Sequence, residues 1–283
     1  MIRRPPRSTQ SRSSAASDVY KRQLLHNGDR FFLMNFAGAD EVGQYALGYK
    51  VVLAAAMLSV GPLCQVWTAR MYDAFELPDA SAYVGRVCTR ILAVLLFAGM
   101  GVCIFRHEAI ALLASPSYRG ASAVMAPLML AHFFWTASNL LDAGLWVHRR
   151  SDLKSWIIFV STPVTLALYA WLVPFYGARG AAFAMLLGLS VHCGITFLVS
   201  QRVFWVRYEF GRVGMMLFSA VGLAVAAGWA GTGVLGALAK LGLWAAWPSA
   251  LWVLGVVTAD EKAMILAAWR RIRRQLLRAP SWG

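Results

Sequence analysis

Long apolar runs separated by short polar segments occupy most of the chain. A helix needs roughly 20 apolar residues to cross the hydrocarbon core of a bilayer. Seven runs reach that length, at about 42–67, 86–105, 121–147, 155–175, 178–200, 212–231 and 234–257. They are apolar on all sides and do not alternate at every second residue, which favours helices over a β-barrel. The stretch Leu24–Ala37 is expected to be the end of an eighth helix. The pattern therefore predicts an all-α integral membrane protein with seven full transmembrane helices and one truncated helix.

Lys and Arg residues are unevenly divided between alternate loops. Fourteen lie in one set of segments, at 70–86, 148–154, 201–212 and after residue 257. Only four lie in the other set, at 38–41, 106–120, 176–179 and 232–240. Cytoplasmic loops carry the excess of positive residues in membrane proteins. We therefore expect the first set of loops, and the C-terminus, to be cytoplasmic.

Residues 258–283 are predicted to form a separate cytoplasmic tail. A stripe of apolar residues at helical spacing is flanked by arginines: Ile265, Trp269, Ile272 and Leu276 beside Arg270, Arg271, Arg273, Arg274 and Arg278. This arrangement is typical of a basic amphipathic helix that lies on a membrane surface and is attracted by anionic lipid. A solvated helix that only adds to the cytoplasmic positive charge is the alternative.

Residues 1–23 differ in character from everything that follows. The tract is basic and rich in Ser, has almost no apolar residues, and contains Pro5 and Pro6 near its start. It has neither the apolar run of a secretory signal nor the amphipathic stripe of a transit peptide. The string SSAASDVYKRQ at its end resembles translated read-through of a sequencing-library adapter. We therefore expect residues 1–23 to be an unstructured artefact and residues 24–257 to be the transmembrane part of a fragment.

Composition supports a membrane protein and argues against several other classes. Hydrophobic residues make up 59% of the chain and the mean hydropathy is +0.57, as in integral membrane proteins. The formal net charge is +14, of which residues 1–23 contribute +5. The remaining charges lie in short separated clusters, so no nucleic-acid partner is expected. The four cysteines form no CxxC pair, and no spacing typical of a metal site, cofactor site or catalytic triad is present. No metal, cofactor or catalytic residue is therefore predicted.

The run 121–147 contains a stripe of polar residues. His132, Thr136, Asn139 and Asp142 follow one another at steps of four, three and three, which places them on one helix face. Polar groups inside a membrane are costly and often functional, so the stripe predicts a cavity lining that contacts a polar substrate or relays protons. Hydrogen bonding between helices is the alternative, and the pattern does not decide between them. His192, alone in its run, is expected to be a packing histidine.

The stretch GDRFFLMNFAGADEVGQYALGYK, residues 28–50, combines charges with glycines. Asp29 and Arg30 are adjacent, and either pair with each other or leave Arg30 available to an anion. Residues 39–43 are predicted to form a tight external turn before the next helix. Gly43 at the end of this turn and Gly48 in the helix permit close approach of a neighbouring helix. Lys50 is expected either to extend toward the membrane interface or to face a cavity.

This stretch resembles the start of the C-terminal lobe in the polysaccharide-export flippases. These proteins move lipid-linked oligosaccharides, such as O-antigen or exopolysaccharide repeat units, and belong to the multidrug/oligosaccharidyl-lipid/polysaccharide superfamily. The family pattern is an Asp-Arg-aromatic group, a Gly-x-x-x-Val-Gly-x-Tyr group and a final Tyr-Lys. The matching residues are Asp29, Arg30, Phe31, Leu33, Gly38, Val42, Gly43, Tyr45, Gly48, Tyr49 and Lys50.

The resemblance implies a fold and a function. The family has two lobes of six helices that enclose a cavity and work by alternating access, sometimes with two extra C-terminal helices. By this resemblance the chain is the C-terminal lobe plus the two extra helices, lacks the N-terminal lobe, and belongs to a bacterial inner membrane. Its partner would be a polyprenyl-diphosphate-linked oligosaccharide, transported for polysaccharide or lipopolysaccharide biosynthesis without catalysis.

The resemblance also suggests roles for individual residues. Arg30 and Lys50 are the candidates for binding the anionic headgroup, and Asp29 would hold Arg30 in place. His132, Asn139 and Asp142 are the candidates for contacting sugar hydroxyls or a coupling proton.

Three alternatives remain open at this point. A multidrug or cation antiporter of the same superfamily would need acid-rich cavity helices, and few buried acids are present. A membrane-embedded glycan polymerase, ligase or acyltransferase would need a large external loop, whereas the longest one here, 106–120, contains only His107 and Glu108 as candidates. A half-transporter that dimerises requires residues 1–23 to be genuine.

Overall fold

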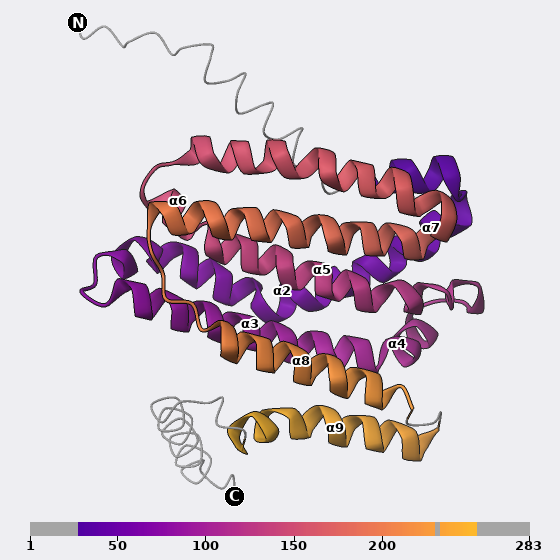
Figure 1. Cartoon of the computed structure of the whole chain (residues 1–283). Coiled ribbons are helices and arrows are strands. Elements are labelled where there is room, and N and C mark those ends of the chain that lie inside the picture. The colour runs from indigo at the N-terminus through magenta and orange to yellow at the C-terminus, as the bar shows by residue number, and fades with distance from the viewer. Residues whose placement is uncertain (1–27, 230–232, 254–283) are drawn as a thin grey trace, which may run out of the picture.

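The computed structural model describes residues 28–229 and 233–253, and its elements there are helices without any strand (Figure 1). A first helix covers residues 28–36. The others are α2 (Ala39–Phe75), α3 (Ala80–Ile104), α4 (Arg106–Leu113), the 3₁₀ turn η1 (Pro116–Tyr118), α5 (Ala121–Leu141), α6 (Ala143–Val147), α7 (Ser151–Val203), α8 (Phe210–Ala227) and α9 (Val234–Val253). The tract 1–23 and the tail 258–283 lie outside the described residues.

The predicted all-helical membrane fold is confirmed. By length and composition, α2, α3, α5 with α6, α7 and α8 can each cross a bilayer. Two predicted spans, 155–175 and 178–200, are the two arms of α7. The last predicted span, 234–257, corresponds to α9 as far as residue 253.

The long element α7 is a hairpin of two antiparallel arms. Gly177 turns the chain with φ 54° and ψ −132°, a conformation open only to glycine. The arms pair about this point: Ser161 Oγ and His192 Nδ1 are hydrogen-bonded at 2.8 Å, and Gly188 lies directly against Thr165. The predicted external loop at 176–179 is thus a turn of minimal length.

The turn predicted at residues 39–43 is wrong by a few residues. The chain turns at Ala37 and Gly38, where Gly38 has φ 88°, and α2 already begins at Ala39. Asp40 and Glu41 therefore occupy the first helical turn, where acidic side chains are favoured by the helix dipole. Glu41 has a second role, because its Oε2 accepts the backbone N–H of Ala178 at 2.8 Å and so caps the second arm of α7.

Helix α5 is the centre of the bundle and packs against α2, α3 and α7. The expected close approach at Gly48 is confirmed: a Cβ there would lie 2.7 Å from Val124 Cγ2 and 3.0 Å from the carbonyl oxygen of Ala121. Gly43 makes only ordinary contact, since its Cβ would lie 3.4 Å from the ring of Tyr118. A single glycine therefore sets the distance between α2 and α5.

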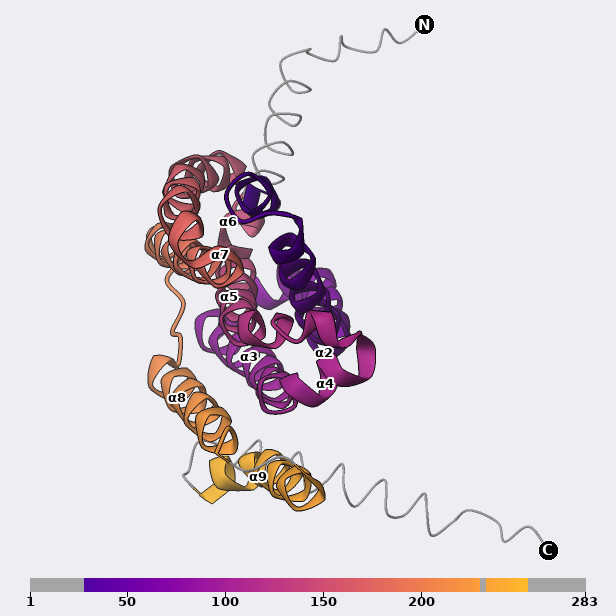
Figure 2. The same ribbon diagram turned by 90° about the vertical axis from the view of Figure 1, so that its right-hand side faces the viewer.

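Helices α8 and α9 lie together at one side of the bundle (Figure 2). Both contact α3, and α9 also packs on α8. Trp244 of α9 stacks on Phe97 at 4.5 Å between ring centroids and donates its indole N–H to the Phe97 carbonyl oxygen at 2.9 Å. Lys240 of α9 forms an ion pair with Glu108 of α4. The two last described helices thus attach to the others through α3 and α4.

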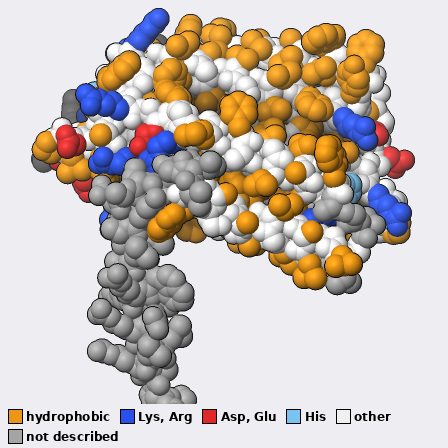
Figure 3. Space-filling model, turned by 60° about the horizontal axis from the view of Figure 1, so that its bottom comes forward, with side chains coloured by type: hydrophobic (Ala, Val, Ile, Leu, Met, Phe, Trp, Pro, Cys, Tyr) orange, Lys and Arg blue, Asp and Glu red, His pale blue; other side chains and the backbone are white. Residues whose placement is uncertain are grey.

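The ends of the helices alternate between two sides of the molecule. The α2–α3, α6–α7 and α7–α8 connections lie at one end, whereas α4, the end of α8 and the start of α9 lie at the other (Figure 1). On the face shown in Figure 3, charged side chains gather toward these two ends and hydrophobic side chains cover the middle. This distribution fits a bilayer crossed by the helices, with the two predicted sets of loops on opposite sides.

Candidate functional site

A groove of about 840 Å³ runs between α2, α5, α6 and the start of α7. Its α2 lining extends from Tyr49 to Tyr72, a rise of about 35 Å at 1.5 Å per residue. The hydrocarbon core of a bilayer is about 30 Å thick. The groove therefore follows α2 over a length comparable with the whole membrane.

The predicted polar stripe lines this groove. His132, Thr136, Asn139 and Asp142 are all among its lining residues. His132 is buried and meets the ring of Tyr49 edge-on at 5.9 Å between centroids. The structure thus brings together the four polar residues that the spacing had placed on one face.

Asp142 interrupts the helix that carries the stripe. The predicted single run 121–147 is divided into α5 and α6 at this residue. Asp142 is buried and forms an ion pair with Lys154, whose ammonium also lies 4.3 Å above the ring centre of Trp146. Sequence reasoning missed this partner because it counted Lys154 only as a cytoplasmic loop charge. The sequence feature that could have identified Lys154 as the partner is its position in the first turn of the helix that follows Asp142.

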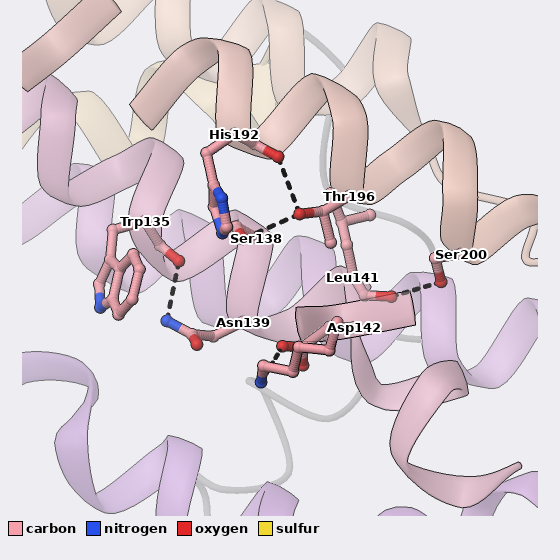
Figure 4. A network of polar contacts seen from close by, with 9 residues as sticks. Trp135, Ser138, Asn139, Leu141, Asp142, His192, Thr196 and Ser200 are labelled. Atoms are coloured by element: carbon pink, nitrogen blue, oxygen red, sulfur yellow. Dashed lines mark hydrogen bonds and ion pairs between the residues drawn. The ribbon is translucent and has the colours of Figure 1, made fainter. Parts of the chain in front are cut away.

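The neighbouring face of α5 carries the hydrogen bonds between helices (Figure 4). Ser138 and Thr196 approach to 3.4 Å, and Ser200 Oγ donates to the carbonyl oxygen of Leu141 at 2.6 Å. His192 bonds to Ser161 and stacks on Trp135, as expected for a packing histidine. The hydrogen bonds Ser138–Thr196 and Ser200–Leu141 thus join α5 to α7 beside the stripe, whereas Asp142 of the stripe joins the end of α5 to Lys154 of α7.

Asn139 is exposed on the groove side of α5. Its Nδ2 donates to the carbonyl oxygen of Trp135, one turn earlier, at 2.9 Å. This bond fixes the direction of the amide, so that its oxygen can accept a bond from a molecule in the groove.

The charged residues of the stretch 28–50 lie outside the groove lining. Asp29 is 1% exposed and accepts the backbone N–H of Arg30 at 2.7 Å, while the side chains of Arg30 and Lys50 are exposed. Lys50 directly follows Tyr49, a lining residue, along α2. Asp29 acts on the backbone at Arg30, and both cations are exposed outside the groove lining.

Trp67 is a lining residue that sequence reasoning did not single out. It is 6% exposed, and its indole Nε1 has no hydrogen-bond partner within the described part of the chain. A buried donor without an acceptor costs about 1–3 kcal/mol. No sequence signal identified it, because an interfacial tryptophan is common in membrane helices.

Comparison with known proteins identifies a solved structure with a similar fold. No family model and no curated protein matches the sequence. Among solved structures, the chain is similar to a lipid II flippase, MurJ, in an inward closed conformation, with a TM-score of 0.69 at 9% sequence identity. The similarity covers 83% of this chain and 52% of that one, so the chain spans about half the length of the flippase it matches. The similarity shows a shared fold.

Proposed function

We propose that the chain is one lobe of a flippase that moves a lipid-linked oligosaccharide across a bacterial inner membrane for polysaccharide biosynthesis. The observation that carries the proposal is the fold shared with half of a lipid II flippase, together with a groove as long as the bilayer is thick. The resemblance of residues 28–50 to polysaccharide-export flippases favours the oligosaccharide repeat unit as cargo. The lobe is taken to be the C-terminal one, with α8 and α9 as the two extra helices.

The proposed roles follow the positions of the candidate residues. Arg30 and Lys50 bind the diphosphate, since both are exposed cations and Lys50 directly follows the lining residue Tyr49. Asp29 fixes the backbone from which Arg30 projects. The stripe contacts the sugar: His132 and Asn139 offer hydrogen-bonding groups, and Asp142 is held by Lys154. The polyprenyl tail stays in the lipid.

The antiporter alternative finds less support in the same groove. An organic cation needs a carboxylate that can give up its present partner. Asp142 is the acidic residue of the lining, and it is already paired with Lys154. Of the two candidates for the enzyme alternative, Glu108 is engaged by Lys240 of α9, and His107 accepts a bond from Arg106.

The test is lipid binding to the chain in nanodiscs. Polyprenyl diphosphate and polyprenyl monophosphate are titrated into the wild type and into the variants Arg30→Glu and Lys50→Glu. We expect each variant to weaken diphosphate binding about tenfold or more, because two opposite charges at close range become two like charges. Arg150→Glu is the matched control, since Arg150 is an exposed cation in the α6–α7 connection, away from both Arg30 and Lys50 in the sequence. Unchanged diphosphate binding in both variants would contradict the proposed role of the two cations.

A further inference from the structure

A cavity separate from the groove lies between α3, α5 and α8, and we call it the α3–α8 cavity. It encloses about 380 Å³, and its lining is apolar apart from one arginine. Small residues of α8 leave the space, because Ala220, Ala224 and Gly228 follow one another at steps of four and share one helix face. The facing wall includes Met129 and Phe133 of α5, which are both buried. The cavity therefore offers an apolar surface on both sides.

The depth of the α3–α8 cavity matches one leaflet of a bilayer. Its lining on α3 runs from Leu95 to Arg106, and its lining on α8 runs from Leu217 to Trp229. At 1.5 Å per residue, each wall rises by about 17 Å. This is close to half of the hydrocarbon core, which is about 30 Å thick. The cavity thus begins at the end of the bundle that carries α4 and reaches about the middle of the membrane (Figure 1).

The cavity is accessible from the surrounding lipid. Val221 and Val225 of its α8 wall are exposed, and so is Trp229 at the end of that wall. Tryptophan is enriched where the membrane meets water, so the position of Trp229 agrees with a cavity mouth at the level of the lipid headgroups. A lipid of the adjoining leaflet can therefore enter the cavity sideways, without crossing the protein.

Arg106 places a positive charge at the mouth of the cavity. It is the charged residue of the lining, and its Nε donates to His107 Nε2 at 3.3 Å, while its terminal nitrogens carry further N–H groups. The acid closest to it in the sequence, Glu108, is paired with Lys240. Within residues 28–229 and 233–253, no ion pair joins Arg106 to an acid. Because a guanidinium binds a phosphate through two parallel hydrogen bonds, Arg106 suits a phosphate headgroup.

We propose that the α3–α8 cavity binds one anionic glycerophospholipid of the surrounding bilayer, with its phosphate on Arg106 and one acyl chain between α3 and α8. The apolar depth of one leaflet accommodates the chain, and the cation at the mouth selects a headgroup with net negative charge. The bound lipid fills the space between α8 and the helices α3 and α5. The site is separate from the groove and from Arg30 and Lys50, so it does not depend on the identity of the transported molecule.

The experiment compares two lipids with the same acyl chains, dioleoylphosphatidylglycerol and dioleoylphosphatidylcholine. Each is titrated into the full chain in detergent, and native mass spectrometry counts the bound lipids. We expect the wild type to bind one phosphatidylglycerol more tightly than phosphatidylcholine. Arg106→Gln should lower the affinity for phosphatidylglycerol about tenfold, as expected for a hydrogen bond to a charged group, and should bring it close to the affinity for phosphatidylcholine. Ala224→Phe places a ring in the cavity and should weaken the binding of both lipids.

Arg119→Gln is the matched control, because Arg119 is an exposed cation of the same 106–120 segment and is not part of the cavity lining. Equal affinities of the wild type for the two lipids would overturn the proposal, and so would equal effects of Arg106→Gln and Arg119→Gln. Arg106→Gln changes a residue at the mouth of the cavity, so it still tests the proposal if Ala224→Phe does not fold.

Polyprenyl monophosphate serves as a third probe in the same titrations. We expect Ala224→Phe to leave its binding unchanged, because the proposed occupant is a lipid of the bilayer and not the transported molecule. If Ala224→Phe weakens the binding of polyprenyl monophosphate as strongly as that of phosphatidylglycerol, the cavity holds a polyprenyl chain and the proposal is wrong, while the proposed function is unaffected.

Discussion

Removal of Lys154 should destabilise the helical bundle, because the carboxylate of Asp142 stays behind without this cation. In Lys154→Met the stem is kept, but the buried Asp142 loses its cation. Breaking a buried pair from one side costs about 3–5 kcal/mol. The Lys154 and Asp142 side chains are 16% and 7% exposed, so some water reaches the pair and we expect the lower part of that range, about 3 kcal/mol. At roughly 2–4 °C per kcal/mol for a chain of this size, the unfolding midpoint should fall by about 6–12 °C.

A double-mutant cycle separates this mechanism from lost packing. Asp142→Asn with Lys154→Met removes both charges, and it should recover most of the loss because no buried charge remains unpaired. Thermal unfolding in detergent is monitored through the loss of the monodisperse chromatographic peak. It is measured for the wild type, the two single variants and the double variant. Arg150→Met is the control: it breaks the exposed pair with Asp152 and should leave the midpoint where it was. The reasoning is refuted if Lys154→Met behaves like Arg150→Met, or if the double variant is as unstable as the two single losses added together.

Three further predictions concern the packing and the ends of the helices. Gly48→Ala should destabilise the bundle by roughly 1–3 kcal/mol by forcing α2 from α5, whereas Gly61→Ala on the same helix, where a Cβ meets nothing within 4 Å, should be neutral or stabilising in the same unfolding assay. Glu41→Ala removes the acceptor for the Ala178 N–H and should cost about 0.5–2 kcal/mol, whereas its neighbour Asp40→Ala should cost less; equal losses would argue against the cap. Burial alone would raise the pKa of Glu108, but its hydrogen bond and charge contact with Lys240 outweigh this and lower the pKa below its usual value. A lowered folded pKa gives stability that is present above the unfolded pKa of about 4.3 and is lost as the pH falls through the lowered value. At pH values below about 4, the thermal unfolding midpoint of the wild type should therefore fall more steeply with decreasing pH than the midpoint of Lys240→Met. Parallel pH profiles of the two proteins would show that the ion pair does not couple to folding.

The sequence predicted the helices well because a membrane span is a long local signal. Each described span from α2 to α8 contains an apolar run that was visible without any knowledge of packing. The predicted turn at residues 39–43 was wrong, whereas the predicted span 121–147 matches the span formed by α5 and α6. The predicted turn includes Asp40 and Glu41, which instead suit the positive first turn of α2. The break at Asp142 was hidden because apolar residues continue on both sides of it.

The site was only partly predictable, for a different reason. The stripe from His132 to Asp142 lies on one helix, so its spacing alone placed it on one face. Lys154 and Trp67 reach the same groove from other helices, and only the packing of the helices brings them near. Adjacency in the sequence did not predict how Asp29 and Arg30 are oriented. Neighbouring side chains on a helix point in different directions, so Asp29 is buried and Arg30 is exposed.

The hairpin of α7 has a consequence for how the protein is inserted into the membrane during synthesis. Only Gly177 separates the two arms, so no loop joins them that would let each arm insert into the membrane separately. The two arms must then enter the bilayer as one unit, with the polar pair Ser161–His192 already matched on leaving water. One residue inserted at the turn would rotate the second arm by about 100° and shift it by about 1.5 Å, separating His192 from Ser161 and Gly188 from Thr165 together. Such an insertion should appear as a failure of membrane integration during synthesis and not as a loss of activity in a correctly inserted protein.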